Sequence, residues 1–184
     1  MAAFLSLLPE KANILDFGCG AGRNALYLAR LGHEVTVSDL SRKALTICET
    51  RAKAEGLRVE VCAYTQGKID ANNGTFDAIL AWSVLDHMTL HEMRSVVREF
   101  SRVAREGAVL LCSFDPEEDP RYFDCPFEVL GDGTFRYVGG KWNGMLFRRY
   151  RKEEITDSLK DSWVVLDFWG PDPTQSKIVL CKKA

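Results

Sequence analysis

The sequence predicts an α/β protein in which one doubly wound, mostly parallel sheet carries helices on both faces. Short strand-like runs alternate with helical segments over the first 114 residues, which is the rhythm of βαβ units. The runs are apolar almost throughout, as expected for strands that are covered on both sides. A glycine-rich turn joins the first run to the first helix, where sheets of this kind form a crevice.

The first two strand–helix pairs occupy residues 14–56. The first apolar run stops at glycines, and Gly32 and Gly56 stand where the two helices would end. The second run is rich in β-branched residues, which favour strands, and Ser41 is suited to cap the helix that follows it. We therefore expect strands at Ile14–Phe17 and Glu34–Ser38, and helices at Asn24–Leu31 and from Ser41 to Gly56.

Three further strands and one helix complete the regular part of the chain. The turn sequence 72–74 precedes an apolar run, and the four residues from Thr89 to Glu92 have the spacing of a capping box. Apolar positions recur at helical spacing after this box until Gly107. We expect strands at Val59–Ala63, Phe76–Ser83 and Ala108–Phe114, with a helix from Thr89 to Gly107.

The alternation breaks after Phe114. Residues 115–133 are rich in Pro, Asp and Gly, and the Gly-Gly-Lys-Trp-Asn-Gly stretch that follows them is typical of a hairpin turn. We expect a hairpin from Thr134–Val138 and Met145–Tyr150, a helix at Lys152–Leu159, and last strands at Trp163–Phe168 and Lys177–Cys181. No linker is recognisable, so we expect one domain over residues 1–184, with 114–151 as an insertion.

Composition excludes several classes of protein. The formal net charge of the 184 residues is −2, which gives no electrostatic footprint for nucleic acid. The basic group at 148–152 is interpreted as a solvated strand end. Six cysteines occur without a C-x-x-C pair or a secretory signal, and no apolar run is long enough to cross a membrane. We expect a reduced, cytoplasmic protein with no nucleic-acid or membrane partner, either a monomer or a homodimer.

The loop between the first strand and the first helix is the strongest candidate for a ligand site. Its glycines, Gly18, Gly20 and Gly22, let a ligand approach the backbone closely. The spacing here is G-x-G-x-G. The dinucleotide fingerprint is G-x-G-x-x-G, which would place its last glycine at position 23, where this chain has Arg23. Asp16 would disfavour a pyrophosphate and suit a cationic ligand, and Asp39 stands where an acid grips ribose hydroxyls.

The stretch from Ile14 to Asn24, Ile-Leu-Asp-Phe-Gly-Cys-Gly-Ala-Gly-Arg-Asn, resembles the first motif of class I S-adenosylmethionine-dependent methyltransferases. Its form resembles small-molecule branches of that family, the tellurite-resistance and thiopurine types. Phe76–Ile79 and Val84–His87 look like the fourth-strand motif, and Asp119–Tyr122 with Gly133–Phe135 are similar to an uncharacterised bacterial branch. The resemblance implies a seven-stranded sheet of order 3-2-1-4-5-7-6 with an antiparallel seventh strand. It also implies methyl transfer from S-adenosylmethionine, with S-adenosylhomocysteine as product.

The same resemblance implies a role for individual residues. Gly18, Cys19 and Gly20 would lie under the methionine part of the cofactor, whose amino group Asp16 would hold directly or through water. Asp39 would accept hydrogen bonds from the ribose hydroxyls, and Leu40 would pack on adenine. Tyr64 or Thr65 stands where the family usually places an acid that contacts adenine. The remaining expected contacts lie at the helix start and the fourth strand: Gly22, Asn24, Trp82 and Ser83.

Methyl transfer to a small molecule needs alignment more than acid–base chemistry, because the leaving group is a neutral thioether. A base is needed only when the acceptor is protonated. Asp86 and His87 are the candidate base or positioning pair, since strand ends face the crevice. The alternative is that His87 packs over the cofactor or caps the next helix. His87 and His91 are four residues apart, but the Thr89 cap separates them and no third ligand is evident, so we expect no metal.

The sequence does not identify the methyl acceptor or the segment that covers the site. Few residues precede Ile14, where family members usually have helices that form part of the lid. Either the site is unusually open, or the 122–150 region or a second subunit forms the lid, or the N-terminus is incomplete. Two readings of the aromatic residues remain, an acceptor wall or a minor core: Tyr122, Phe123, Phe127, Phe135, Trp142 and Trp169. An NAD-dependent oxidoreductase and a non-catalytic module that binds the cofactor or a partner remain as alternative functions.

Overall fold

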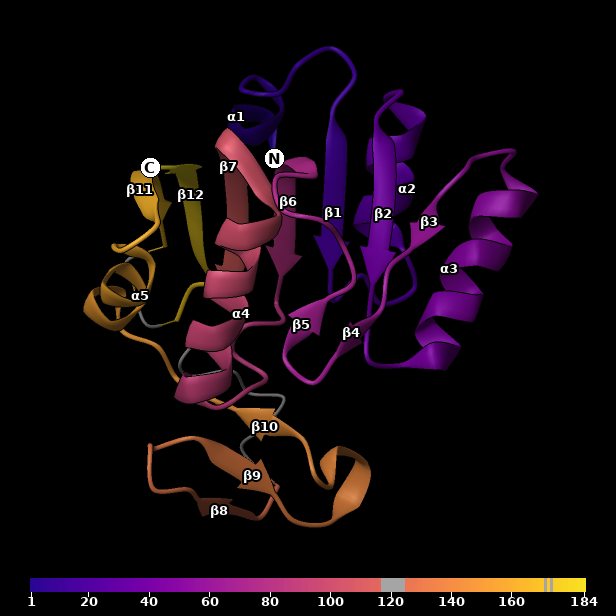
Figure 1. The fold of residues 1–184 in the computed structure, drawn as a ribbon. Helices are drawn as coiled ribbons and strands as arrows, with labels where there is room; N and C mark the ends of the chain where they lie inside the picture. Colours follow the sequence, from indigo (N-terminus) through magenta and orange to yellow (C-terminus); the bar gives the residue numbers. More distant parts are fainter. Residues whose placement is uncertain (117–124, 171, 173) are drawn as a thin grey trace.

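The computed structural model describes residues 1–116, 125–170, 172 and 174–184. Its main feature is a seven-stranded sheet of order β11-β12-β7-β6-β1-β2-β3 (Figure 1). All strand pairs are parallel except those of β12, which runs antiparallel to β7 and β11. The expected order 3-2-1-4-5-7-6 with an antiparallel seventh strand is confirmed. The strands are β1 Asn13–Phe17, β2 Glu34–Ser38, β3 Glu60–Val61, β6 Phe76–Trp82, β7 Ala104–Phe114, β11 Trp163–Trp169 and β12 Lys177–Lys183.

Helices cover both faces of this sheet because successive side chains in the strands point to opposite sides. In β1, Ile14 packs with the cluster that contains α1, α2 and α3, whereas Leu15 packs with the cluster that contains α4 and α5. Both side chains are fully buried. The helices are α1 Ala2–Leu5, α2 Arg23–Arg30, α3 Arg42–Ala54, α4 Leu90–Val103 and α5 Lys152–Leu159. None of the helices in the described residues has the length and apolar character needed to cross a bilayer.

The expected strand at Val59–Ala63 is wrong in extent. Only Glu60–Val61 pairs with β2, after which the chain leaves the sheet and forms a separate hairpin of β4 Tyr64–Thr65 and β5 Lys68–Ile69. The two loop residues of this hairpin, Gln66 and Gly67, have φ values of 51° and 78°. Positive φ at both positions is the geometry of a tight hairpin turn, which the sequence analysis did not recognise.

The expected end of the fourth helix at Gly107 is also wrong. The helix ends at Val103, and Ala104 already has extended backbone angles and pairs with Phe76 of β6. The register then shifts between Phe76 and Ala78, and Gly107 has a φ of 73°. Gly107 therefore accommodates an irregularity inside β7 and does not terminate a helix.

A small three-stranded sheet of order β10-β9-β8 lies beyond the carboxyl ends of the main strands (Figure 1). Its strands are β8 Phe127–Val129, β9 Phe135–Tyr137 and β10 Leu146–Phe147, with a short 3₁₀ turn at Gly140–Trp142. The expected hairpin of Thr134–Val138 and Met145–Tyr150 is confirmed as β9 and β10, with narrower bounds. β8 falls in a segment that was expected to be irregular.

Candidate functional site

The glycine-rich loop after β1 has a conformation that requires glycine. The φ values of Gly18, Gly20 and Gly22 are 72°, 53° and 83°, in the region that other residues rarely adopt. A Cβ on Gly18 would lie 2.5 Å from the side chain of Val84, and one on Gly22 would lie 2.4 Å from the Sγ of Cys48. Two of the three glycines thus serve both backbone geometry and close packing.

The carboxylate of Asp39 ties this loop to the end of β2. One oxygen accepts from the N–H of Gly20 at 2.8 Å, and the other accepts from the N–H of Ser41 at 2.8 Å. The N–H groups of Gly18 and Cys19 also point at the carbonyl of Ser38. Each carboxylate oxygen keeps acceptor capacity beyond its one bond, so Asp39 can both brace the loop and receive hydroxyls.

Asp16 lies beneath the loop rather than at its surface. Its side chain is 1% exposed, and one carboxylate oxygen, Oδ2, has no hydrogen-bond partner among the described residues. Burial raises the pKa of this carboxyl to about 7, although a hydrogen bond from the backbone of Ala25 lowers the pKa in part. Asp16 is thus a buried acid that titrates near neutrality.

Cys19 sits in the loop as a small buried residue. It hydrogen-bonds the thiol of Cys48, and this bond together with burial raises the pKa of Cys19 well above its ordinary value. A thiol with a raised pKa carries little nucleophilic thiolate. The structure therefore favours packing over chemistry at this position.

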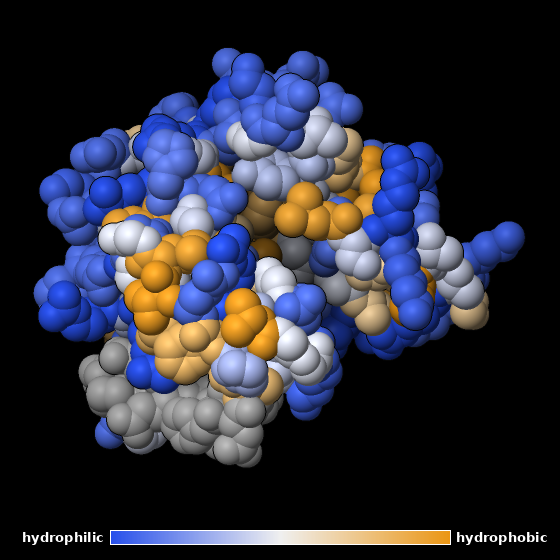
Figure 2. All heavy atoms as spheres, turned by 90° about the horizontal axis from the view of Figure 1, so that it is seen from below, coloured by the Kyte–Doolittle hydropathy of each residue, from blue (hydrophilic) through white to orange (hydrophobic). Residues whose placement is uncertain are grey.

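Three adjoining hollows follow the carboxyl edge of the sheet, and Figure 2, which looks onto this edge, shows a recess near the middle of the face. The first measures about 360 Å³ and the second about 230 Å³, and they share Asp39, Leu40 and Tyr64. The third, about 660 Å³, shares Gly18, Ser83 and His87 with the second. Neighbouring hollows share these wall residues, so the three lie in a row from Leu40 to the small sheet; this row of hollows is called the channel below.

Ser83 marks the point where β6 leaves the sheet and enters the channel. Its φ is 48°, an uncommon value for serine. Its N–H donates to the Oγ of Ser113 on the neighbouring strand β7 at 2.9 Å. Backbone strain of this kind is common at functional sites, where the surrounding contacts stabilise the uncommon conformation.

His87 belongs to the wall of the channel, whereas Asp86 lies behind it. The Nδ1 of His87 is 3.0 Å from the carbonyl of Leu146 in β10. A carbonyl can only accept, so Nδ1 carries the proton in this bond and the lone pair of a neutral ring is on Nε2. The backbone N–H of His87 donates to the backbone carbonyl of Val84.

Asp86 is fully buried and joins three segments of the chain. One carboxylate oxygen accepts from the N–H of Asp115 at 2.6 Å, and its main-chain carbonyl accepts from the N–H of Arg148 at 2.8 Å. Burial raises the pKa of Asp86 to about 6, while the nearby His87 lowers it. These contacts give Asp86 the geometry of a positioning residue that fixes the ends of β7 and β10 relative to His87.

His87 and His91 are four residues apart, but they were not expected to bind a metal, because a helix cap at Thr89 was expected between them. Thr89 forms both hydrogen bonds of the expected capping box with Glu92, and His91 is exposed on α4. Asp115 is the residue that approaches instead: Asp86, His87 and Asp115 each offer an atom within 4.8 Å of the others. The expectation that the protein binds no metal stays a prediction.

Most of the sequence-predicted site residues reach the channel. They are Gly18, Cys19, Asn24, Asp39, Leu40, Tyr64, Thr65, Trp82, Ser83 and His87. Asp16, Gly20, Gly22 and Asp86 do not line the three hollows. Sequence reasoning did not assign several wall residues: Phe17, Val84, Met88, Asp115, Met145 and Ser176. Phe17 and Val84 lie inside the two motifs and Met88 directly follows His87, whereas no local pattern marks Asp115, Met145 and Ser176.

The aromatic residues divide between the two readings. Trp142 lines the third hollow. Trp142 and Phe135 also pack against the minor core of Tyr137 and Phe147. Phe127 contacts Phe135 with tilted rings whose centroids are 4.7 Å apart, but it is 47% exposed. Trp169 lies on the edge strand β11 and is 37% exposed. Tyr122 and Phe123, together with the 119–122 stretch, lie outside the described residues.

Comparison with known proteins gives the same fold and a family. A family model described as a methyltransferase domain matches residues 14–107, which is just over half of the chain. A ubiquinone biosynthesis O-methyltransferase of Methylocella silvestris is 34% identical over 104 residues, covering 56% of this chain and 40% of the relative. The chain therefore spans about two fifths of the length of this curated relative.

Solved structures match over nearly the whole chain at low identity. A methyltransferase from Methanosarcina mazei, described as SAM-dependent, has a TM-score of 0.81 at 20% identity and covers 100% of this chain and 97% of that one. The 1,6-didemethyltoxoflavin-N1-methyltransferase of Burkholderia thailandensis, solved with 1,6-didemethyltoxoflavin and S-adenosylhomocysteine, has a TM-score of 0.77 at 20% identity, covering 100% and 76%. At this identity, the likeness concerns the fold.

Proposed function

The chain belongs to the methyltransferase domain family, and from this premise we propose that it transfers a methyl group from S-adenosylmethionine to a small-molecule acceptor by in-line displacement. The observation that carries the proposal is the row of three adjoining hollows along the carboxyl edge of the sheet. One end has a carboxylate and apolar walls suited to a nucleoside, and the other end is open and polar. Gly18 and Ser83 lie where the two ends meet.

The residues around the glycine loop fit a cationic cofactor better than a dinucleotide. Asp16 and Asp39 place two carboxyl groups near the loop, which would repel a pyrophosphate and attract an ammonium or sulfonium group. Asp39 would hold the ribose hydroxyls, Leu40 would cover adenine, and Tyr64 and Thr65 would close the far end. Asp16 would act from beneath the loop, through water or through the charge that it carries when ionised.

The bound cofactor supplies an activated methyl group whose departure leaves a neutral thioether. The protein's task is therefore to align the acceptor and exclude water. His87 would face the acceptor with Nε2 and accept its proton where the acceptor is protonated at neutral pH. Asp86 would orient His87 indirectly, by holding Asp115 and Arg148 in place. The 114–151 insertion would serve as a lid, with Trp142 and Met145 on the acceptor side.

The test is calorimetry with S-adenosylmethionine and S-adenosylhomocysteine on the folded chain, followed by methyl-transfer assays on a panel of phenolic, amine and thiol acceptors. We expect both ligands to bind and at least one acceptor class to be methylated in a His87-dependent way. Failure of both ligands to bind would sink the proposal. Binding without turnover on any acceptor would support the alternative of a non-catalytic cofactor-binding module.

The family membership sets aside the NAD-dependent alternative, which can be checked with NADH in the same calorimeter. We further propose that the protein acts in the cytoplasm as a monomer or homodimer, without nucleic-acid or membrane partners. The net charge of −2 supports the absence of nucleic acid. Sedimentation of the purified chain, with and without S-adenosylhomocysteine, measures the oligomeric state.

A further inference from the structure

The β4–β5 hairpin carries part of the channel but is not part of the main sheet. Tyr64 and Thr65 line the first hollow beside Asp39 and Leu40. β4 and β5 pair only with each other in the part of the chain that the structure describes, with two residues in each strand. A two-residue hairpin has little stability of its own, so its position must be set by contacts from elsewhere.

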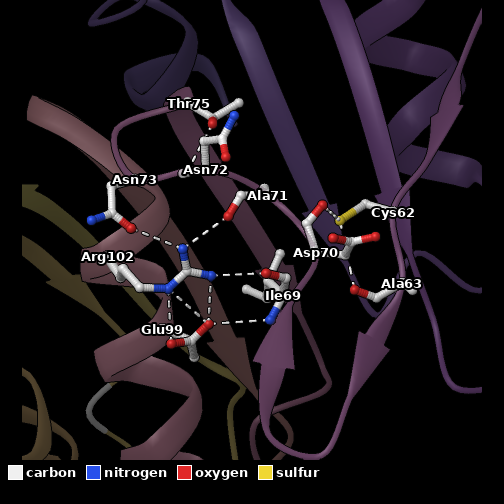
Figure 3. Close-up of polar contacts among 10 residues, drawn as sticks. All are labelled: Cys62, Ala63, Ile69, Asp70, Ala71, Asn72, Asn73, Thr75, Glu99 and Arg102. Carbon is white, nitrogen blue, oxygen red and sulfur yellow. Dashed lines mark hydrogen bonds and ion pairs between the residues drawn. The ribbon is translucent and has the colours of Figure 1, made fainter.

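The side chain of Ile69 is buried in the main core, and the polar contacts from α4 centre on one arginine in its last turn (Figure 3). The guanidinium of Arg102 donates to the carbonyl of Ile69 at 2.8 Å, to the carbonyl of Ala71 at 2.8 Å and to the Oδ1 of Asn73 at 3.0 Å. It thereby collects acceptors from β5 and from the chain just after it. A planar fork with five fixed donors can satisfy such a set, whereas the single ammonium group of lysine cannot reproduce it.

Glu99, one turn earlier on α4, completes the arrangement. Its Oε2 accepts from the N–H of Ile69 at 3.1 Å and from Arg102 at 2.8 Å. The hydrogen bond from Arg102 lowers the pKa of Glu99, so the carboxylate is ionised at neutral pH. The side chains of Glu99 and Arg102 are 14% and 31% exposed, which limits screening by solvent.

A second contact from α4 reaches the same hairpin through aromatic rings. Phe100 packs edge-on against Phe17, and Phe17 packs edge-on against Tyr64, with centroids 5.1 Å apart in both pairs. Phe17 and Tyr64 line the second hollow, whereas Glu99 and Arg102 line none of the hollows at the carboxyl edge. The last turns of α4 therefore hold the hairpin at both its backbone and its Tyr64 ring.

We propose that the Glu99–Arg102 pair is a positioning device that sets the affinity for the adenosine end of the cofactor by fixing the β4–β5 hairpin against Asp39 and Leu40. This inference rests on the proposed function, because it assumes that the first two hollows receive adenosine. The pair acts through Tyr64 and Thr65 and has no part in the methyl-transfer step.

The experiment measures the Kd of S-adenosylhomocysteine and of adenosine for the full chain by calorimetry, with R102K and E99Q as variants. We expect R102K to raise both Kd values about tenfold and E99Q to raise them by a smaller factor. The kcat at saturating S-adenosylmethionine should stay within twofold of wild type. The matched control is R105Q, which removes an ion pair with Asp77 at the opposite edge of the sheet and should leave both Kd values unchanged.

Amide hydrogen exchange supplies a readout that a general loss of stability would not give. In R102K, exchange should accelerate at residues 64–71 while the amides of β1 and β6 keep their protection. Should R102K fail to fold, N73A removes a single contact of the same guanidinium and should raise the Kd about twofold to threefold.

Two results would overturn the inference while leaving the proposed function intact. In the first, R102K binds S-adenosylhomocysteine with the wild-type Kd even though amide exchange at residues 64–71 has accelerated. The other is a loss of kcat at unchanged cofactor affinity. If the wild-type chain itself fails to bind S-adenosylhomocysteine, the proposed function has failed and the inference falls with it.

Discussion

The first two hollows, called the cofactor half after the role proposed for them, and the third hollow, called the acceptor half in the same way, are built differently. The described walls of the cofactor half come from residues 17–88, and hydrogen bonds link the glycine loop to the end of β2. The acceptor half also uses the glycine loop and the end of β6, and it adds Asp115, Trp142, Met145 and Ser176 from later segments of the chain. The family match, residues 14–107, covers the described walls of the first two hollows and most of those of the third, and it ends before Asp115, Trp142, Met145 and Ser176.

This difference indicates which part of the channel tolerates changes in sequence and which part does not. A nucleoside-type crevice depends on backbone geometry that few sequences can adopt, so it is recognisable from a short motif. An acceptor wall made of side chains on loops can change without disturbing the sheet. The following predictions test whether the two halves are as separate as their construction indicates.

The largest effect is expected from Gly18→Ala at the centre of the cofactor half. The added Cβ would meet Val84 at 2.5 Å in a backbone conformation with φ of 72°, and these two penalties together cost about 3 kcal/mol. We expect binding of S-adenosylhomocysteine to weaken by roughly a hundredfold or more. Denaturant unfolding and calorimetry measure the two quantities.

Gly32→Ala is the control for Gly18→Ala. Gly32 has a φ of 90°, but a Cβ there would meet no atom within 4 Å, so it should lose only about 1 kcal/mol of stability and keep its cofactor affinity. Equal behaviour of the two variants would show that the contact with Val84 does not matter.

Asp39→Ala should produce the next largest effect. The change removes the proposed ribose acceptor and leaves the N–H groups of Gly20 and Ser41 without their partner. We expect the Kd of S-adenosylhomocysteine to rise about 10- to 100-fold, while the KM for the acceptor changes little. Asp77→Asn, at the opposite edge of the sheet, is the control. A change in acceptor KM as large as the change in Kd would mean that the halves are coupled.

Asp16 should make stability depend on pH in a way that identifies it. Burial raises its folded-state pKa from 3.8 to about 7, so the folded protein holds a proton between these values that the unfolded chain has lost. The contribution to stability is full below about pH 4 and is lost as pH rises through 7. From pH 5 to pH 8, the free energy of unfolding should fall about 2 kcal/mol more in wild type than in Asp16→Asn. Parallel pH curves for the two proteins would refute the assignment.

The smallest of these effects is expected from Trp142→Ala in the acceptor half. Trp142 lines the third hollow and is absent from the first two. We expect the KM for a methylated acceptor to rise about tenfold, because an aromatic wall contributes 1 kcal/mol or more, with unchanged affinity for S-adenosylhomocysteine. Val129→Ala is the control, since Val129 lies in the same small sheet and is 60% exposed. Weaker cofactor binding in Trp142→Ala would contradict the separation of the halves.

Elements that local patterns mark were predictable from the sequence. Alternating apolar runs predicted the main strands, the family resemblance implied their order, and the Thr89–Glu92 capping box and the glycine loop with Asp39 beside it are present in the structure. A short element that is stabilised from a distance was not predictable. The β4–β5 hairpin has two-residue strands, and its support comes from Glu99 and Arg102, some 30 residues later in the chain.

The sequence by itself determined the sheet, the glycine loop and the position of Asp39, because hydrophobic period and backbone requirements are written in neighbouring residues. Only the tertiary structure decided that Asp16 is buried, that Asp86 supports the wall from behind, and that Asp115 and Trp142 join His87 in one hollow. Burial and proximity of this kind depend on contacts between residues far apart in the chain, and such contacts leave no local pattern.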